Sequence, residues 1–245
     1  MRIPCITLIA LALWGLFPLE GLPQSASGDK EQEYAKVNVG VKAGFNSSMY
    51  FIDKFSVGGV ELDGIQNNYK VGYFGSFFCR FNLKKHHYLQ TELSYNVSKG
   101  SIAVPQTAEY REVLTDNVLI RTSVHSIDVP LLYGYKFVDT YPYGMAFFVG
   151  PKVAYNWEKQ GKSEYAGFFQ QGIKEEMHPL YFSCVIGLAV NVSNIFFDFR
   201  YEAGLHNMIH EVTFDASDTE APYNTQAIEL KKRRNVLSFS LGVIF

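Results

Sequence analysis

The residues of this chain that could do chemistry are charged side chains that alternate with apolar ones. An isolated charge is costly to bury, so acids and bases gathered on one protected face must pair. A continuous row of such pairs could relay protons or ions, whereas separate pairs would only fill the inside of the fold. Six cations and four anions have this placement: Lys42, Lys70, Arg80, Lys136, Lys152, Arg200, Glu92, Asp128, Asp198 and Glu202.

Sequence spacing predicts which of these charges meet. Asp128 and Lys152 lie at equal distances on either side of a short turn, so they should be neighbours on adjacent strands. Arg80 and Glu92 have a similar relation across another turn, and Arg200 should pair with acids on its own strand or across the interior. We favour a structural network, because eight strands enclose little more than their own side chains. Its predicted members are Arg80, Glu92, Asp128, Lys152, Asp198, Arg200 and Glu202.

Other reactive side chains form no catalytic or metal-binding pattern. His86 and His87 are adjacent, and adjacent side chains of an extended chain point in opposite directions. The same alternation separates His125 from Ser126 and Asp128, so no nucleophile relay forms. We therefore predict no catalytic residue, no metal site, no cofactor and no enzymatic activity.

The element that defines the architecture is the C-terminal segment. From Asn235 to Phe245, apolar and small or polar residues alternate over 11 positions, about the length of a strand that crosses a bilayer. A single strand in lipid would leave its backbone groups unpaired, so the chain must close into a barrel. The terminal Phe245 is predicted to be an assembly signal for the barrel-insertion machinery. The preceding Lys231, Lys232, Arg233 and Arg234 are predicted to lie at the outer headgroup level and to contact lipid phosphates.

Seven further segments alternate in the same way. Long polar links at about 51–67, 99–121, 158–178 and 207–231 alternate with short ones, as in membrane barrels. A soluble barrel would have an apolar interior, but here the apolar face carries the aromatic residues of a lipid-facing surface. The sequence thus predicts an all-β, eight-stranded antiparallel up-and-down transmembrane β-barrel over residues 36–245. The strands are expected at about 36–50, 68–83, 87–99, 122–137, 143–157, 179–191, 195–205 and 235–245, with a bulge at Pro130.

The N-terminal residues predict export from the cytoplasm. Residues 1–26 have the charged start, apolar core and small-residue end of a signal peptide, and residues 27–35 form a flexible periplasmic lead-in. Cys79 and Cys184 fall on non-neighbouring strands and should remain free thiols. The net charge of −2 argues against nucleic-acid binding. The expected location is the bacterial outer membrane, with membrane lipid and lipopolysaccharide as partners.

Several short motifs resemble the PorT-type outer-membrane β-barrel family of Bacteroidetes. They are Val41–Asn46 (VKAGFN), Asp128–Leu132 (DVPLL), Gly150-Pro151 and Phe199–Asn207 (FRYEAGLHN). The founding member serves the type IX secretion system, so the resemblance implies an accessory role in the export and maturation of secreted proteases. It also implies contacts with other secretion-system proteins. The alternative is a structural barrel or a surface adhesin with external binding loops, and a narrow lumen disfavours a solute channel.

Overall fold

The computed structural model describes residues 36–84, 86–157 and 162–245. The predicted signal peptide (1–26) and lead-in (27–35) lie outside these residues. The described chain is almost entirely antiparallel β-structure, with two short 3-10 turns.

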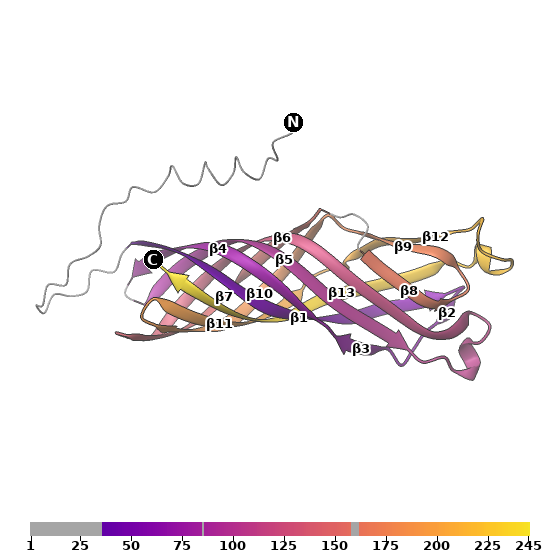
Figure 1. Cartoon of the computed structure of the whole chain (residues 1–245), viewed down its shortest axis with the longest axis horizontal. Coiled ribbons are helices and arrows are strands. Elements are labelled where there is room, and N and C mark those ends of the chain that lie inside the picture. The colour runs from indigo at the N-terminus through magenta and orange to yellow at the C-terminus, as the bar shows by residue number, and fades with distance from the viewer. Residues whose placement is uncertain (1–35, 85, 158–161) are drawn as a thin grey trace, which may run out of the picture. The chain divides into compact units, whose positions relative to one another are not determined.

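Eight strands form a closed ring in which each strand pairs with the next along the chain (Figure 1). The last strand pairs with the first from Gly40↔Ile244 to Val57↔Ile228, and this closes the barrel. The prediction of an eight-stranded antiparallel up-and-down barrel is confirmed. The ring strands are β1 (Val37–Val57), β4 (Val71–Lys84), β5 (His87–Val104), β6 (Leu114–Thr140), β7 (Tyr143–Asn156), β10 (Leu180–Val192), β11 (Ile195–Gly204) and β13 (Ile228–Ile244).

Alternation along each strand decides which side chains face outward. In β1, for example, Phe45 is 66% exposed, whereas Lys42 is only 3% exposed. The outward apolar residues form a band at the end of the barrel that holds the C-terminus and the three short links, which we call the turn end. The opposite end is the outer end. An apolar outside around a charged inside is the pattern of a barrel in lipid.

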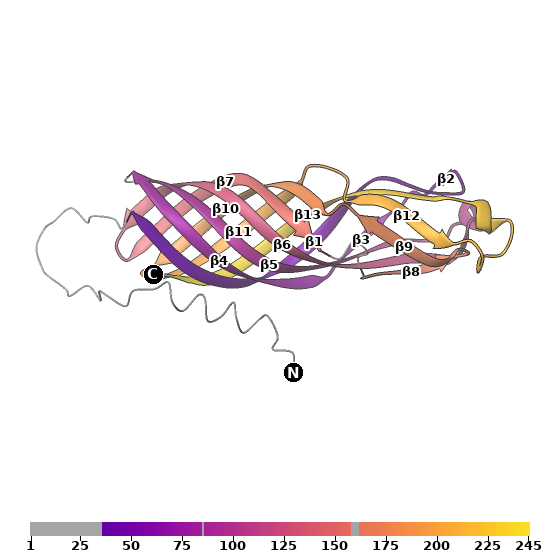
Figure 2. The same ribbon diagram turned by 90° about the horizontal axis from the view of Figure 1, so that it is seen from above.

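The predicted long polar loops are largely strands, and this corrects the sequence analysis. β5 continues to Val104, β6 already begins at Leu114, and β13 begins at Ile228. The ring strands therefore continue well beyond the apolar band. Smaller elements surround their ends: β2 (Val60–Glu61), β3 (Gln66–Tyr69), η1 (Ala108–Tyr110), β8 (Lys162–Phe168), β9 (Gln171–Met177), β12 (Ile209–Asp215) and η2 (Tyr223–Thr225). Figure 2 shows β2, β8, β9 and β12 at the outer end.

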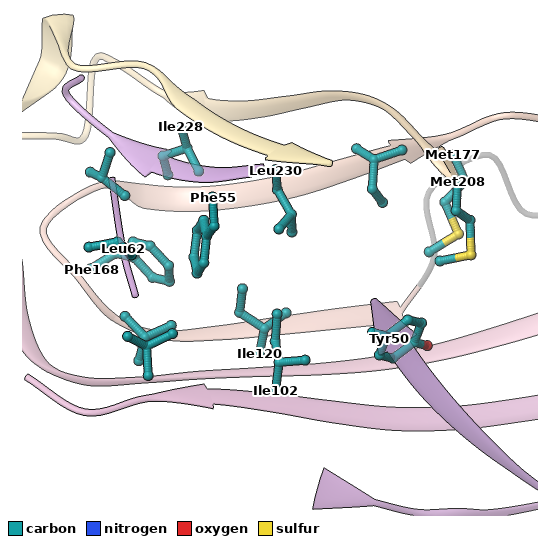
Figure 3. Close-up of a cluster of buried hydrophobic side chains, with 14 of the residues drawn as sticks. Tyr50, Phe55, Leu62, Ile102, Ile120, Phe168, Met177, Met208, Ile228 and Leu230 are labelled. Carbon is teal, nitrogen blue, oxygen red and sulfur yellow. The ribbon is translucent and has the colours of Figure 1, made fainter. Parts of the chain in front are cut away.

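These extensions are stable because they enclose an apolar core. Side chains from the ring strands and from the outer hairpins converge on it (Figure 3). Burial of such residues contributes about 1.5–3 kcal/mol each, which offsets the entropy of ordering a long loop. The core includes Tyr50, Phe55, Leu62, Ile102, Ile120, Phe168, Met177, Met208, Ile228 and Leu230.

The bulge predicted at Pro130 is wrong. The pairing of β6 with β7 has the same register at Val129↔Val153 and Tyr133↔Val149, and it shifts only between Lys136 and Val138. The pairing with β5 likewise keeps its register between Thr91↔Leu131 and Ser94↔Asp128. The missing N–H of the proline is therefore accommodated without an extra residue.

Candidate functional site: the charged interior and the outer end

The interior network is centred on Arg200 in β11. Its guanidinium donates to both Glu92 carboxylate oxygens, at 2.9 and 2.7 Å, and to Asp198 Oδ2 at 2.6 Å. All three residues are buried. Two parallel N–H···O bonds to one carboxylate form the strongest common ion-pair geometry. The prediction that Arg200 pairs along its own strand and across the interior is met by Asp198 and Glu92, respectively.

Lys42 is the network member that sequence reasoning missed. Its Nζ lies 2.9 Å from Glu92 Oε2 and 3.0 Å from Asp198 Oδ2. Glu92 lies on β5, two strands from β1 in one direction, and Asp198 lies on β11, two strands away in the other. The alternation did indicate that Lys42 faces inward. Its partners depend on how the sheet closes, which no local spacing reveals.

Lys152 joins the other predicted acids. Its Nζ donates to Asp128 Oδ2 at 2.8 Å and also pairs with Glu202. The expected proximity of Asp128 and Lys152 is therefore present. Asp128 also accepts a hydrogen bond from Ser126 Oγ at 2.6 Å.

Arg80 connects to the network indirectly, which corrects the predicted pair with Glu92. The register places Arg80 opposite Gln90 and Phe78 opposite Glu92. Arg80 Nε donates to Gln90 Oε1 at 2.8 Å, and Gln90 Nε2 donates to Glu92 Oε1 at 2.6 Å. The guanidinium carbon also lies 4.4 Å from the centre of the Tyr88 ring.

Lys136 and Lys70, the other two residues that were predicted to face inward, lie outside the network. Lys136 pairs with Asp139 at 3.7 Å near the turn end. Lys70 is exposed on the outside of the barrel, because β3 and β4 pair with β5 in registers that differ by one residue. A shift of one residue moves a side chain from the inner to the outer face of the barrel, and no signal in the sequence predicted this shift at Lys70.

The network leaves little free space. A cavity of about 40 Å³ lies between Glu92, Asp128, Lys152, Arg200 and Glu202. This holds a few water molecules at most. The arrangement holds these charges in fixed pairs, and its role in stabilising the fold stays a prediction.

The apolar core closes the interior at the outer end. Val57, Val104, Leu114, Val118 and Ile120 are each 0% exposed. A path for ions or protons would have to cross this desolvated layer, which is costly for any charge. The interior is thus closed by two different means, paired charges in the apolar band and packed apolar side chains beyond it.

The predicted lipid contacts of Lys231–Arg234 are wrong for two of the four residues. Lys232 and Arg234 are 0% exposed and lie inside the barrel. Lys232 Nζ donates to Glu175 Oε1 at 2.7 Å and to Thr122 Oγ1 at 3.2 Å. The reason is that β13 begins earlier than predicted, so its alternation continues through this segment and directs every second side chain inward.

Lys231 and Arg233 point outward, and their lipid contacts stay a prediction. Both are exposed, and Arg233 forms two bonds with the Asp53 carboxylate at 3.0 and 2.8 Å. Phe245 is also exposed, and its backbone N–H donates to Val39 O at 2.7 Å at the point of closure. Its role as an assembly signal stays a prediction as well.

Three histidines gather where β9 and β12 meet the barrel. The ring of His178 lies 5.1 Å from that of His210 and 6.1 Å from that of His206, between ring centres. His206 Nε2 accepts a hydrogen bond from the Phe182 backbone N–H at 3.1 Å. This cluster joins the two-stranded β9–β12 sheet to the ring.

Acidification should loosen the β9–β12 sheet. Burial, and then His210 and His206, lower the pKa of His178 from its usual value of 6.5. The folded chain therefore binds fewer protons than the unfolded chain once the pH falls below about 6.5, so stability decreases there. We expect faster amide hydrogen exchange in β9 and β12 at pH 5 than at pH 7.5, after correction for intrinsic rates. His178→Gln should remove the difference and His87→Gln at the turn end should not; equal protection at both pH values contradicts the prediction.

The described residues include two free cysteines but no metal-binding group and no membrane-spanning helix. In ranges 36–84, 86–157 and 162–245, no group of three or more His, Cys, Asp or Glu side chains could hold a metal ion. Over the same ranges, no helix is long and apolar enough to span a membrane. Cys79 and Cys184 are free thiols, as predicted.

The closed ring, the apolar band and the charged interior define an integral outer-membrane β-barrel protein. A family model described as "Outer membrane protein beta-barrel domain" matches residues 24–210. The chain belongs to this family, and its location is the outer membrane. None of the curated proteins matches the sequence.

The solved structures to which this chain is similar are distant in sequence. OprG of Pseudomonas aeruginosa is 7% identical with a TM-score of 0.51, and the match covers 85% of this chain and 95% of that one. Ail of Yersinia pestis, in complex with the heparin analogue sucrose octasulfate, is 10% identical with a TM-score of 0.38 over 86% and 100%. Neisserial surface protein A is 10% identical with a TM-score of 0.36 over 85% and 97%. At such identity OprG supports the fold alone.

Proposed function

We propose that this protein is a non-enzymatic outer-membrane barrel that acts through the surfaces of its outer end, as an accessory component of type IX protein secretion. In this role it assists the export and maturation of secreted proteases by binding other secretion-system proteins. The observation that carries the proposal is the closed interior: paired charges and an apolar core fill the space through which a solute would pass. A folded domain is far wider than an eight-stranded lumen, so cargo cannot take this route.

The outer end offers the surface that such a role needs. Its hairpins are ordered by the apolar core and by polar contacts between elements far apart in sequence. Phe169 and Tyr223 stack with ring centres 3.8 Å apart and join the β8–β9 turn to η2. Preformed surfaces bind partners at a lower entropic cost than mobile loops. The resemblance to the PorT-type family supplies the link to secretion.

A surface adhesin is the second candidate, because the same ordered outer end also suits binding outside the cell. The two functions differ in what a gene deletion changes. Loss of an accessory component should retain protease precursors inside the cell, whereas loss of an adhesin should leave the exported proteins unchanged and reduce attachment.

The test uses a deletion strain of the source bacterium that is complemented with one of two variants. The measured quantity is the amount of exported protease divided by the amount of folded barrel. One variant replaces the tip of the outer end (216–226) with a Gly-Ser linker, and it should fail to restore export. The other, Arg200→Gln with Glu202→Gln, alters the interior alone and should restore it. Normal export in the deletion strain, or loss of export by the interior variant alone, would overturn the proposal.

A further inference from the structure

Two hollows lie on the outside of the barrel wall, one at β1, β4, β5 and β6 and the other, nearer the outer end, at β3, β5 and β6. The lower hollow has a volume of about 400 Å³ and lies in the apolar band. Its floor is at Gly75, where an added Cβ would meet nothing within 4 Å. The residues around it are those of a lipid-facing surface: Val41, Phe77, Leu93, Tyr95, Ile127 and Trp157. A hollow of this kind suits an acyl chain.

Aromatic rings mark the upper limit of this hollow. Tyr95 and Trp157 stack with ring centres 5.5 Å apart, and the Tyr95 hydroxyl lies 2.9 Å from His125 Nδ1. Tyrosine and tryptophan with a wet polar edge are typical of the level at which acyl chains give way to headgroups.

The upper hollow, of about 330 Å³, is polar and basic. It is lined by Asn67, Asn68, Lys70, Ser101 and Arg121, together with Tyr69 and Leu119. The register explains this set, because Ser101 of β5 pairs with Asn68 on one side and with Arg121 on the other. Amide and hydroxyl groups beside two cations match a ligand with both phosphate and sugar groups.

A bulge concentrates positive charge at this hollow. Tyr69 pairs with Gly100, and Tyr73 pairs with Val97. The two tyrosines are four positions apart, whereas their partners on β5 are three apart. The segment that joins β3 to β4 therefore contains one extra residue. The shift exposes Lys70 next to the level of Lys99, which is exposed too. Adjacent like charges are unfavourable unless an anion lies between them. Arg121 adds a third cation, and its contact with Glu164, 3.3 Å long, is between largely exposed side chains.

The separation of the two hollows fits one lipid molecule. Tyr95 and Ser101 are six positions apart, or about 20 Å along a strand. With a strand tilt of about 40°, this is about 15 Å of height. The basic hollow therefore lies above the level of the aromatic rings, on the side of the lipid headgroups.

We propose that these hollows form a binding site for a phosphorylated glycolipid of the outer leaflet, of the lipid A type. An acyl chain occupies the hollow over Gly75, and a phosphate contacts Lys70, Lys99 and Arg121. The basic upper hollow matches the phosphate groups of this ligand, and the apolar lower hollow matches its acyl chains.

Binding to the purified full-length barrel in a nonionic detergent tests the charge of the site. Native mass spectrometry counts bound lipid A, monophosphoryl lipid A and phosphatidylcholine in separate titrations. The wild type should prefer lipid A, and the triple variant Lys70→Gln, Lys99→Gln, Arg121→Gln should lose at least tenfold in affinity. The matched control Lys54→Gln, Arg111→Gln, Lys174→Gln removes three other exposed cations, none of which lines either hollow, and should bind as the wild type does.

A second variant tests the shape. Gly75→Leu places an apolar side chain in the lower hollow without changing charge, and its Cβ meets no atom within 4 Å. It should therefore fold normally and bind lipid A several-fold more weakly. Millimolar inorganic phosphate should not displace the lipid. The proposal is overturned if the triple variant loses no more than its control, if phosphatidylcholine binds equally well, if Gly75→Leu has no effect, or if free phosphate competes.

Discussion

Replacing Arg200 with Gln should lower the free energy of unfolding by about 3–5 kcal/mol, the cost of breaking a buried pair by removing one partner. The change removes the two bonds to Glu92 and the bond to Asp198. Both carboxylates remain buried, with Lys42 as their shared cation. Urea titration of the barrel refolded into lipid vesicles measures the effect, with gel mobility of unboiled samples as the measure of folding.

The matched control is Lys54→Gln at the outer end. Lys54 pairs with Glu229 at 2.5 Å, but 44% of its side chain is exposed. An exposed pair contributes little, because water and salt screen it and two long side chains lose freedom. If Arg200→Gln lowers the urea midpoint of unfolding no more than Lys54→Gln does, the interior pairs do not stabilise the fold.

Deletion of Phe245 should reduce the amount of assembled barrel several-fold. The residue provides two bonds between β1 and β13, Phe245 N–H to Val39 O and Val39 N–H to Phe245 O, at 2.7 and 3.3 Å. The residue is 68% exposed at the turn end, where it is accessible to insertion machinery. Folded barrel in outer-membrane fractions is measured on unboiled gels, because a closed barrel with satisfied backbone bonds resists detergent.

Two further variants distinguish recognition of the aromatic ring by the insertion machinery from closure of the barrel by backbone hydrogen bonds. Phe245→Tyr keeps an aromatic ring and both backbone bonds, so it should assemble normally. Phe245→Ala keeps the bonds but loses the ring, and it should assemble nearly as poorly as the deletion if the ring is what the machinery contacts. Normal assembly of the deletion variant would show that the terminal residue has no role in either step.

Local alternation and turn spacing were sufficient to predict the barrel. Each strand has a period of two, and that property depends only on the chain itself. For this reason the eight strands, the apolar outside and the inward direction of Lys42 and Arg200 could be derived from the sequence. The pair Asp128–Lys152 was predictable for the same reason, since a short turn relates the two strands that carry it.

Only the tertiary structure decided contacts between strands that are not neighbours in sequence. Glu92 meets Arg200, which is 108 positions away, and Lys42, which is 50 positions away, because the sheet closes on itself. The apolar residues of the long links pack with one another and with ring-strand residues such as Ala154 and Tyr181. This packing turned predicted loops into strands, and the longer β13 directs Lys232 and Arg234 inward. A one-residue shift between β3 and β4 moved Lys70 to the outside. These outcomes depend on closure and on packing across the interior, and the free energy of both comes from residues far apart along the chain.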